Sequence, residues 1–395
     1  MQKRLKIGLF IDSYFPMIDG VTMVVHNYAT RLALVADVVV FCTQLKEPFD
    51  DSKFNYTVVR NTMTAPLPLT DYRTPLPKID IKFMKKLNSY DFDIVHIHSA
   101  FGVGKKGVEY AKKRGIPCLF TMHSQHLKDL YERTHILWFS KLVTKSLCKV
   151  INKCDYTYAV NQKTAHLWVE YGCKKLPNVL LNATDLYYQE SDELVDTLRL
   201  KHQFTDEKIF VYCGRIDKTK NIDFTLQVLK NLKNSGMKYK MIFIGGGSYF
   251  ETFKRHIIEN DLENECILIG KLYDRDLLAA YYKLSHLQIF PSTYDTCSLV
   301  KLEAASQMTP TIFAKNSFAA STIIADQNGY EEELDVKKFA KKIIDILENE
   351  KEYQAVRKNC YNEVYCHWDD RIKEVYQLYQ DLIIDYQIKT KKMNK

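Results

Sequence analysis

The chain has 395 residues, of which 46% are hydrophobic and 26% charged, so it has the length and composition of two globular domains. These values exclude disordered, fibrous and low-complexity proteins, and no apolar run approaches the roughly 20 residues that a membrane-spanning helix needs. The net charge of +8 is uneven: residues 1–190 carry 26 basic and 17 acidic side chains, a net +9, and the remainder is at −1. We therefore expect the first half to face negative charge.

Short apolar runs alternate with helical patterns along the whole chain. In order, the runs lie at 6–11, 38–42, 56–59, 94–98, 118–121 and 156–160, and then at 209–213, 241–244, 266–269, 287–290 and 311–314. Because most of them are continuously apolar rather than alternating, we expect parallel strands with helices on both faces. The rhythm predicts an α/β protein with two doubly wound domains.

A polar, acidic stretch at 182–206 interrupts this alternation and marks the boundary between the domains. We assign 1–185 to an N-terminal domain and 186–369 to a C-terminal domain. The last helical pattern, at 369–388, has apolar residues three and four apart. Such a helix must pack somewhere, and we expect about 370–395 to return to the first domain.

Several features that resemble ligand motifs are interpreted as structural. None of the ten cysteines lies in a C-x-x-C pair, which favours reduced, buried thiols. The D-x-D at 91–93 lies directly before a buried strand, which favours a turn and edge role. The histidine pairs at 96 and 98 and at 123 and 126 lack a third ligand at a suggestive spacing, so no metal site is predicted. The G-x-G-x-x-G at 102–107 follows the fourth strand rather than the first, which favours a glycine-rich helix entry over a dinucleotide site.

The candidate chemistry lies at the strand ends of the second half. Gly214 follows a predicted strand and precedes Arg215 and Lys220, two cations five residues apart. Arginine offers a planar fork of donors and lysine a point charge, which together suit a diphosphate. Glycines 245–247 and the segment 269–272 end the next two strands, where α/β sheets place ligands.

The fourth segment carries two carboxylates, Asp295 and Glu303, on either side of a helix that should begin near Ser298. Carboxylates accept hydrogen bonds from sugar hydroxyls, and a helix N-terminus offers free N–H groups to a phosphate. The alternative interpretation makes Asp295 a helix cap and Glu303 a solvated helix residue. The other three segments weigh against that alternative.

These spacings resemble the donor site of the retaining glycosyltransferases of family 4. Further stretches similar to the family lie at 15–21 (FPMIDGV), 93–98 (DIVHIH), 120–123 (FTMH), 181–186 and 326–330, so the resemblance spans nearly the whole chain. It implies the GT-B fold, in which two Rossmann-like domains face each other across a cleft. Within the family, 15–21 and 316–320 are most similar to bacterial diacylglycerol glucosyltransferases and related envelope enzymes.

The resemblance also implies roles for single residues. Arg215 and Lys220 would hold the diphosphate of the donor, and Glu303 its ribose. Asp295 would contact hydroxyls of the donor sugar, and His123 would touch that sugar from the acceptor side. The catalytic candidates are thus Arg215, Lys220, Asp295 and His123. The other donor-binding candidates are Gly20, Gly214, Gly246, Lys271, Leu272, Cys297, Ser298 and Leu299.

The chain departs from the family pattern at four of these or neighbouring positions. Asp295 is one methylene shorter than the usual glutamate, Cys297 and Ser298 replace an aromatic residue and a glycine, and Met308 stands where the family normally has glycine. These departures leave the transferred sugar open. They also leave open a degenerate copy that binds without transferring.

The implied reaction is transfer of a hexosyl unit from a UDP-sugar with retention of configuration. In this reading Asp295 and Glu303 grip hydroxyls, so neither is a nucleophile, in contrast to two-carboxylate glycosidases. Catalysis would rest on stabilising the departing diphosphate with Arg215, Lys220 and helix N–H groups. Because these cations supply the positive charge, we expect no metal and no cofactor.

The acceptor is expected on the basic first domain. Trp138 precedes Lys141, Lys145 and Lys149, which lie four residues apart on one helical face. A basic helix with aromatic residues at one end suits an anionic membrane surface, although a solvated face is the simpler alternative. With no secretory signal in view, we expect a cytoplasmic enzyme, peripheral on the inner face of the cell membrane, that acts on a lipid or lipid-linked glycan.

Three other functions are weighed against this one. The first is a transferase for a soluble polysaccharide or a protein acceptor, and the second is a non-catalytic GT-B partner that activates another transferase. The third, a nucleic-acid binder, lacks a recognisable module with interleaved aromatics, so no nucleic acid is expected. Self-association is left open.

Overall fold

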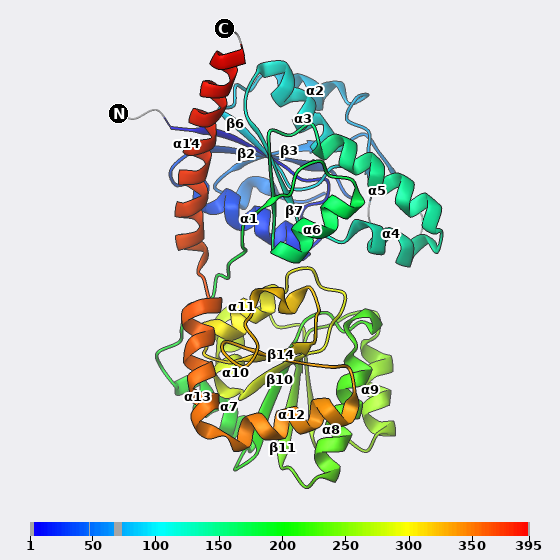
Figure 1. The fold of residues 1–395 in the computed structure, drawn as a ribbon, viewed down its shortest axis with the longest axis vertical. Helices are drawn as coiled ribbons and strands as arrows, with labels where there is room; N and C mark the ends of the chain where they lie inside the picture. Colours follow the sequence, from blue (N-terminus) through cyan, green and yellow to red (C-terminus); the bar gives the residue numbers. More distant parts are fainter. Residues whose placement is uncertain (1–3, 47, 67–72, 394–395) are drawn as a thin grey trace. The chain divides into compact units, whose positions relative to one another are not determined.

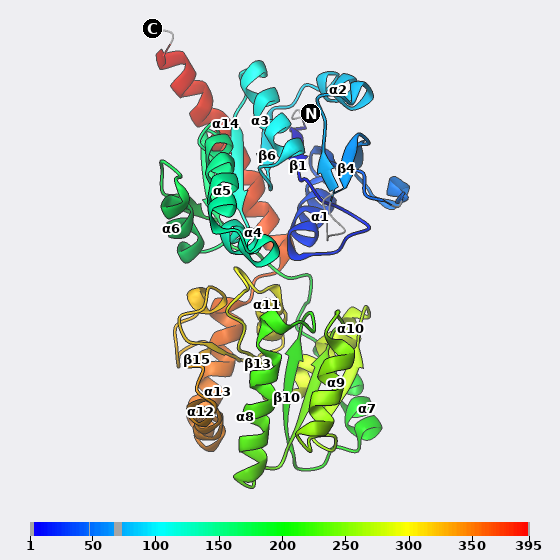
Figure 2. The same ribbon diagram turned by 90° about the vertical axis from the view of Figure 1, so that its right-hand side faces the viewer.

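The structure is a computed structural model that describes residues 4–46, 48–66 and 73–393. The chain divides into two compact units. Met1–Asn182 together with Trp368–Lys395 form unit 1, and Ala183–His367 form unit 2. The chain thus crosses between the units after residues 182 and 367, where the sequence placed the crossings after 185 and 369. Figures 1 and 2 show the ribbon of each unit.

Unit 1 is built on a seven-stranded sheet in which all neighbouring strands are parallel, in the order β3-β2-β1-β6-β7-β8-β9. The order reverses between β1 and β6, which is the switch point where open α/β sheets bind ligands at their carboxyl edge. The strands are β1 (Lys6–Phe10), β2 (Asp37–Thr43), β3 (Thr57–Asn61), β6 (Ile94–Ile97), β7 (Cys118–Met122), β8 (Tyr156–Ala159) and β9 (Asn178–Val179).

Helices cover both faces of this sheet (Figure 1). One face packs Phe41 and Ile97 into a core shared with α2 (Ile81–Asn88), α3 (Gly102–Arg114), α5 (Leu137–Ile151) and α6 (Gln162–Tyr171). Alternate strand residues such as His96 point to the other face, which α1 (Gly20–Leu32) and α14 (Trp368–Met393) cover. The short α4 (His126–Thr134) packs against α5.

The C-terminal helix α14 belongs to unit 1, as the sequence predicted. The Tyr379 hydroxyl lies 2.6 Å from His96 Nδ1, and the Arg31 guanidinium lies 2.6 Å from the Asp369 carboxylate. Trp368 is buried against Tyr28 with ring centroids 5.5 Å apart. The helix begins one residue before the predicted start because this tryptophan anchors its first turn.

Unit 2 repeats the plan with a six-stranded parallel sheet in the order β12-β11-β10-β13-β14-β15. Its switch point lies between β10 and β13. The strands are β10 (Lys208–Cys213), β11 (Tyr239–Ile244), β12 (Cys266–Gly270), β13 (Leu287–Phe290), β14 (Thr311–Ala314) and β15 (Tyr330–Glu332). Each strand of the central four was predicted from a continuous apolar run, and nearly all their residues are buried.

Helices again cover both faces of the sheet (Figure 2). Phe210 and Phe243 point into a core shared with α8 (Ile222–Asn234), α9 (Phe250–Glu259), α12 (Val336–Glu348) and α13 (Glu350–Asn359). Val211 and Ile242 point into the opposite core, which α7 (Glu193–His202), α10 (Arg275–Leu284) and α11 (Leu299–Ser306) complete. The polar stretch expected to break the alternation thus contains helix α7, whose buried Val195 and Leu198 were outnumbered by charged neighbours.

All eleven predicted apolar runs form strands. The sequence missed β9 and β15, together with the antiparallel pair β4 (Thr64–Pro66) and β5 (Arg73–Pro75). Each of these strands has only two or three residues, too few for an apolar run to stand out. Within the described residues, no helix has the length and apolar character to cross a membrane.

Candidate functional site

The loops that follow β10, β11 and β12 lie against one another at the carboxyl edge of unit 2. The Gly214 amide donates to Ile244 O (3.0 Å), and the Gly245 amide donates to Gly270 O (2.8 Å). Gly245 has φ +140°, and a Cβ there would lie 1.8 Å from Gly214 O. Only glycine fits this approach, and so the predicted glycine segments do come together.

Lys220 is the buried cation of this edge, with only 7% of the residue exposed. It ends the short 3₁₀ turn Lys218–Lys220, and its Nζ donates to Asp295 Oδ1 at 2.5 Å. The second oxygen of Asp295 is buried and has no hydrogen-bond partner among the described residues. The predicted phosphate-binding lysine and the predicted sugar-binding carboxylate therefore neutralise each other before any ligand is present.

Arg215 is the exposed cation of the same edge. Its side chain is 61% exposed and lies 3.8 Å from the Asp217 carboxylate, a loose contact that leaves the guanidinium free to turn. Its backbone carbonyl accepts from the Tyr212 hydroxyl (3.0 Å), which fixes the backbone of the turn. An exposed arginine beside a buried lysine can bring a second positive charge to an anionic ligand.

Helix α11 begins at Leu299, with Ser298 as the N-cap residue and Cys297 before it. The predicted start of a helix near Ser298 is therefore confirmed. The Ser298 side chain makes no hydrogen bond to the first turn, so the first backbone amides of α11 have no side-chain cap. Asp295 does not cap the helix, because its carboxylate is held by Lys220. This edge is suited to an anion.

Glu303 lies on α11 in a network that the sequence did not reveal. Its Oε1 accepts from Arg275 Nη2 (2.8 Å) and its Oε2 accepts from the Tyr282 hydroxyl (3.1 Å). The same Arg275 nitrogen donates to Asp185 Oδ1 at 2.5 Å. Burial raises the pKa of the neighbouring Cys213 thiol to about 12, so this side of the network carries no thiolate at neutral pH.

Lys271 and Leu272 follow β12 directly. Lys271 is exposed, and Leu272 is half-buried against the core beneath α10. A Cβ on Gly246 would lie 3.0 Å from Lys271 Cγ, so the stem of this lysine rests on the glycine loop. Both donor-binding candidates therefore follow a strand end of the unit 2 sheet, as the glycine segments do.

Two residues of the predicted donor and catalytic set, Gly20 and His123, belong to unit 1. Gly20 is the exposed first residue of α1, capped by Asp19, whose carboxylate accepts from Thr22 N at 2.7 Å. His123 follows β7, and its Nε2 lies 3.0 Å from His98 Nδ1. Burial lowers the pKa of His123 to about 3, and neighbouring His126 adds to this shift. The imidazole is therefore neutral at pH 7.

The glycines at 102–107 and Asp93 have structural roles. Helix α3 begins at Gly102, and a Cβ on Gly104 would lie 1.7 Å from Ser99 O, so these glycines serve a close helix entry. Asp93 accepts from the Lys6 amide at 2.8 Å at the strand edge. All ten cysteines are free thiols. Among the described residues, no group of three or more His, Cys, Asp or Glu side chains is arranged to hold a metal ion.

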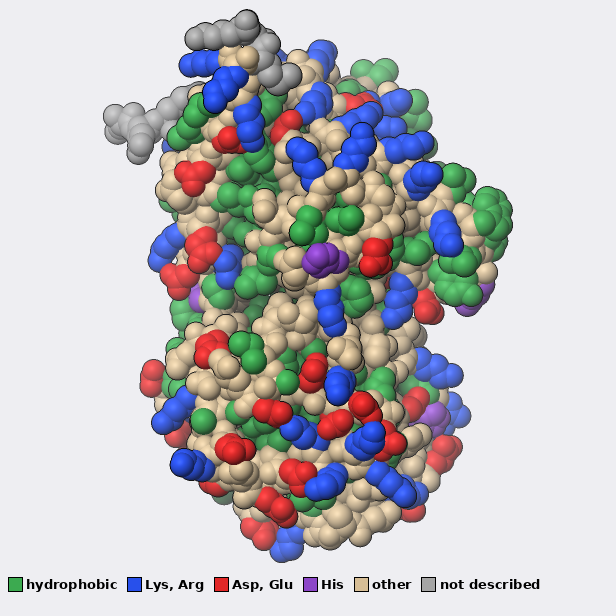
Figure 3. All heavy atoms as spheres, in the orientation of Figure 1, with side chains coloured by type: hydrophobic (Ala, Val, Ile, Leu, Met, Phe, Trp, Pro, Cys, Tyr) green, Lys and Arg blue, Asp and Glu red, His purple; other side chains and the backbone are tan. Residues whose placement is uncertain are grey.

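The exposed face of α5 combines apolar and basic side chains. Its buried side is formed by Ser140, Thr144, Leu147, Cys148 and Ile151. On the opposite side Trp138 is 70% exposed and Leu142 60% exposed. The predicted lysines at 141, 145 and 149 are exposed, and none makes an ion pair with a described residue. Apolar side chains gather at the outer end of α4 and α5 in Figure 3.

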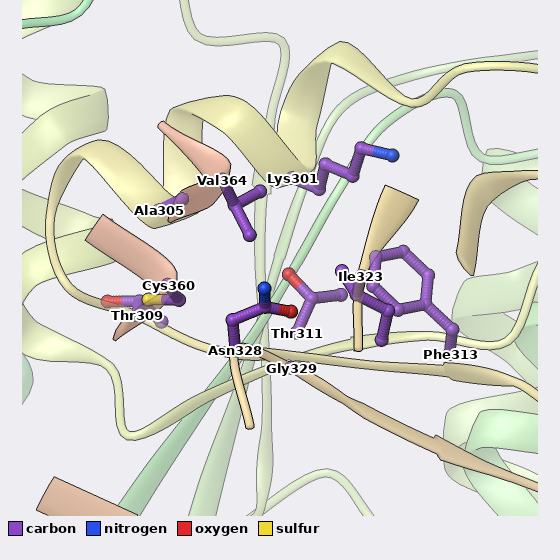
Figure 4. A pocket seen from close by; sticks show the side chains of 10 residues that line it. All are labelled: Lys301, Ala305, Thr309, Thr311, Phe313, Ile323, Asn328, Gly329, Cys360 and Val364. Carbon is purple, nitrogen blue, oxygen red and sulfur yellow. The ribbon is translucent and has the colours of Figure 1, made fainter. Parts of the chain in front are cut away.

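A small pocket in unit 2 contains none of the predicted site residues (Figure 4). Lys301 of α11 contributes to its wall, and its Nζ donates to Ala319 O (2.8 Å) and to Thr322 Oγ1. Burial lowers the pKa of this lysine. Its amine ties α11 to the 3₁₀ turn Ala319–Thr322. The lining comprises Lys301, Ala305, Thr309, Thr311, Phe313, Ile323, Asn328, Gly329, Cys360 and Val364.

Two family models match this chain, one in each half. The model described as Glycosyltransferase Family 4 matches residues 18–187, and the one described as Glycosyl transferases group 1 matches residues 195–363. The chain is 24% identical over 333 residues to the alpha-monoglucosyldiacylglycerol synthase of Streptococcus pneumoniae, covering 82% of this chain and 74% of that protein. It is 25% identical over 346 residues to the protein of the same name from Acholeplasma laidlawii, covering 82% and 84%.

Solved structures share the fold. Sucrose-phosphate synthase from Thermosynechococcus elongatus superposes with a TM-score of 0.78 at 21% identity, covering 97% of this chain and all of that one. Anabaena HepE, solved in complex with UDP and glucose, superposes with a TM-score of 0.73 at 16% identity, covering 95% of this chain and all of that one. With both units matched, the chain belongs to the family 4 glycosyltransferases of the GT-B fold, and it is similar to the alpha-monoglucosyldiacylglycerol synthases.

Proposed function

We propose that this glycosyltransferase transfers a hexosyl unit from a UDP-sugar to a membrane-associated acceptor, a lipid or a lipid-linked glycan, with retention and without a metal. The observation that carries the proposal is the anion-binding edge of unit 2, where buried Lys220, exposed Arg215 and the start of α11 follow parallel strands. Two relatives are named for synthesis of a glucosyldiacylglycerol, and the solved HepE complex contains UDP. Both support this choice of donor and acceptor.

Different residues would bind the diphosphate, the ribose and the sugar of the donor. Lys220 and Arg215 bind the diphosphate, and the first amides of α11 add hydrogen bonds. Glu303 accepts from the ribose hydroxyls. Asp295 would divide its two oxygens between protein and sugar: Oδ1 accepts from Lys220, and Oδ2, which has no hydrogen-bond partner among the described residues, would accept from a sugar hydroxyl.

In this proposal the sugar is transferred with retention and without a protein nucleophile. The acceptor hydroxyl attacks the anomeric carbon on the face that the diphosphate leaves, and a phosphate oxygen takes its proton. The C–O bond to UDP breaks as the new glycosidic bond forms. Lys220 and Arg215 stabilise the negative charge that develops on UDP, which is electrostatic preorganisation. Neutral His123 contributes a hydrogen bond to the sugar rather than a charge.

The acceptor proposal rests on the surface of α5. Three exposed lysines without an ion-pair partner in the described part of the chain lie on the same helix as exposed Trp138 and Leu142. Such a surface suits a membrane with anionic lipids, because apolar side chains can enter the interface while lysines meet the headgroups. The enzyme would then be peripheral on the inner face of the cell membrane and cytoplasmic, and its product would be a glycolipid of the cell envelope.

The donor is tested by thermal shift with a panel of UDP-sugars in the presence of a chelator. Ligands that bind only the folded protein raise its melting temperature. We expect one UDP-sugar to do so for the wild type and not for Lys220→Ala or Glu303→Ala. Donor hydrolysis, followed by NMR at the anomeric proton, then reports the configuration of the released sugar. No shift with any nucleotide sugar would remove the transferase proposal in favour of a non-catalytic partner.

The acceptor is tested with vesicles containing diacylglycerol, with and without anionic phospholipid. Replacing Lys141, Lys145 and Lys149 by glutamine should weaken vesicle binding about a hundredfold, at about 1 kcal/mol per lysine. A matched control replaces three exposed lysines of unit 2, Lys230, Lys337 and Lys351, and should bind as the wild type does. Equal losses in the two triple variants, or transfer to soluble acceptors alone, would contradict the membrane proposal.

A further inference from the structure

We propose that Arg275 is a positioning residue of the nucleotide site: it holds the Glu303 carboxylate ready for the ribose hydroxyls and links it to Asp185 beside the chain crossings. This inference rests on the proposed function, in which Glu303 binds the ribose. All three residues belong to unit 2. Arg275 is the first residue of α10 and lies 28 residues before Glu303 and 90 after Asp185.

The Glu303 carboxylate is partly buried, with 12% of its side chain exposed, so it depends on its protein partners. Arg275 and Tyr282 each engage one oxygen. A carboxylate has about four acceptor positions, so one lone pair on each oxygen is left for a ligand diol. Without Arg275, the carboxylate would keep only the phenol and could rotate about its last torsion.

The Arg275 guanidinium binds both carboxylates through one nitrogen and leaves another of its donors without a hydrogen bond in the described part of the chain. Arg275 Nη2 serves both Asp185 and Glu303. Its Nε is buried and has no hydrogen-bond partner among the described residues. A buried unsatisfied donor is uncommon in native proteins and calls for a reason. We see that reason in the second carboxylate, since Asp185 fixes the position from which Arg275 reaches Glu303.

Asp185 stands where the two chain crossings meet. The neighbouring Thr184 amide donates to Cys366 O at 3.0 Å, and Thr184 pairs with His367 in an isolated β-bridge. The rings of Tyr187 and His367 stack with centroids 3.7 Å apart. Both crossings are thus joined within unit 2, and Arg275 connects this junction to the ribose carboxylate. Ribose binding and the stability of the junction are coupled in both directions if this connection carries free energy.

The test compares UDP with 2′,3′-dideoxyuridine diphosphate, which lacks the ribose diol, by isothermal titration calorimetry on the full chain. We expect the wild type to bind UDP about tenfold more tightly than the dideoxy analogue. Arg275→Gln should abolish this preference while leaving the affinity for the analogue unchanged. Arg275→Lys keeps the charge but not the fork, and should restore part of the preference.

The matched control is Lys283→Gln. Lys283 lies on the same helix and also binds the early part of unit 2, through Asp192 and Gln189 O, but it does not touch Glu303. It should keep the full preference for UDP. Hydrogen exchange gives a second readout: UDP should protect the amides of 183–187 in the wild type and in Lys283→Gln, but not in Arg275→Gln.

The outcomes separate this inference from the proposed function. A wild type that binds neither nucleotide overturns both. A wild type that binds both equally removes the ribose role of Glu303 and with it the role of Arg275, while the diphosphate site stands. If the wild type prefers UDP and folded Arg275→Gln keeps that preference, Arg275 is a structural ion pair alone and the inference is wrong.

Discussion

The two units treat the polar groups at their strand ends in opposite ways. In unit 1, His98 and His123 contact each other, and burial lowers the pKa of both, so the pair is neutral near pH 7. In unit 2, the corresponding groups are charged and paired, Lys220 with Asp295 and Arg275 with two carboxylates. The strand ends of unit 1 thus carry neutral hydrogen-bonding side chains, and those of unit 2 carry ion pairs.

This difference matches the proposed division of labour. Neutral imidazoles can orient hydroxyl groups without attracting an anion, which suits a sugar or an acceptor. Paired charges form an anion site that is stable before the ligand arrives and that the diphosphate then rearranges. Removing one member of a pair should therefore harm unit 2 more than losing a single surface charge would.

The largest expected effect is that of Lys220→Ala. It leaves the Asp295 carboxylate, of which one oxygen is already buried without a partner, uncompensated at the edge of the sheet. We expect unit 2 to lose about 3 kcal/mol of stability, together with UDP binding. Urea-dependent hydrogen exchange of β10 and β13 measures this loss in unit 2 separately from unit 1.

Two further variants test whether the loss comes from breaking the buried ion pair. Lys220→Met combined with Asp295→Leu removes both charges and should restore most of the stability but none of the UDP binding. Arg215→Ala removes an exposed cation with a loose ion pair and should change stability by less than about 0.5 kcal/mol. A loss as large in Arg215→Ala as in Lys220→Ala would mean that burial of the pair is not what matters.

The second effect is a fall in the stability of unit 1 on acidification. The folded-state pKa of His123 is about 3, below its unfolded value near 6.5, so the unfolded chain binds the proton first. The stability that this group contributes is complete above pH 6.5 and is lost as the pH falls toward 3. Between pH 7.5 and 5 the loss is about 2 kcal/mol for this histidine alone, and His96 and His98 shift in the same direction.

Two other titratable groups, one in each unit, also change the stability between pH 7.5 and 5. Burial raises the pKa of Asp12 to about 6, which offsets about 1 kcal/mol of the loss in unit 1. Burial lowers the pKa of His286 to about 4, so unit 2 also weakens, through fewer groups. Hydrogen exchange at pH 7.5 and 5.0 should show the greater loss of protection in β6 and β7 of unit 1. A greater loss in β10 and β13 would refute the assignment of the neutral cluster to unit 1.

Much of the fold was predictable because both sheets are buried on two faces. A strand such as β10 is covered by helices on each side, so its buried positions after Lys208 are all apolar or aromatic, and its sequence shows this without any alignment. Strands β4 and β5 are short and edge-like, so their residues carry no such constraint. Met308 adopts φ +58°, the left-handed conformation that favours glycine, which is the residue the family normally has there.

The site was predictable where it consists of consecutive residues and not where it depends on distant ones. Glycines 245–247 and the cations after β10 stand at strand ends, and strand ends converge in a parallel sheet. The contact of Lys220 with Asp295 spans 75 residues, and nothing in the sequence assigns these two groups to each other rather than to a ligand. Arg275 gave one physical signal: a cation in the first turn of a helix, where the macrodipole disfavours it.

A third effect concerns the surfaces of the units. Trp138→Ala removes the most exposed tryptophan and should weaken vesicle binding by about 1.5 kcal/mol without changing stability, since the ring packs little against the protein. Leu200→Ala on α7 of unit 2 is the control, because that side chain is also largely exposed. Vesicle flotation measures both variants. Equal losses would show that any exposed apolar side chain suffices, and the basic face of α5 would lose its special role.

The smallest effect on stability, and the sharpest test of unit 1 as a contributor to the reaction, is Gly20→Ala. No atom lies within 4 Å of the Cβ it would gain, and the backbone does not require glycine at this first position of α1. Stability should therefore change by less than about 0.5 kcal/mol, or rise slightly. If the open space at Gly20 exists for the donor diphosphate, kcat/KM should fall about tenfold. Unchanged kcat/KM would leave diphosphate binding to unit 2 alone, because a methyl group in the path of the ligand cannot be neutral.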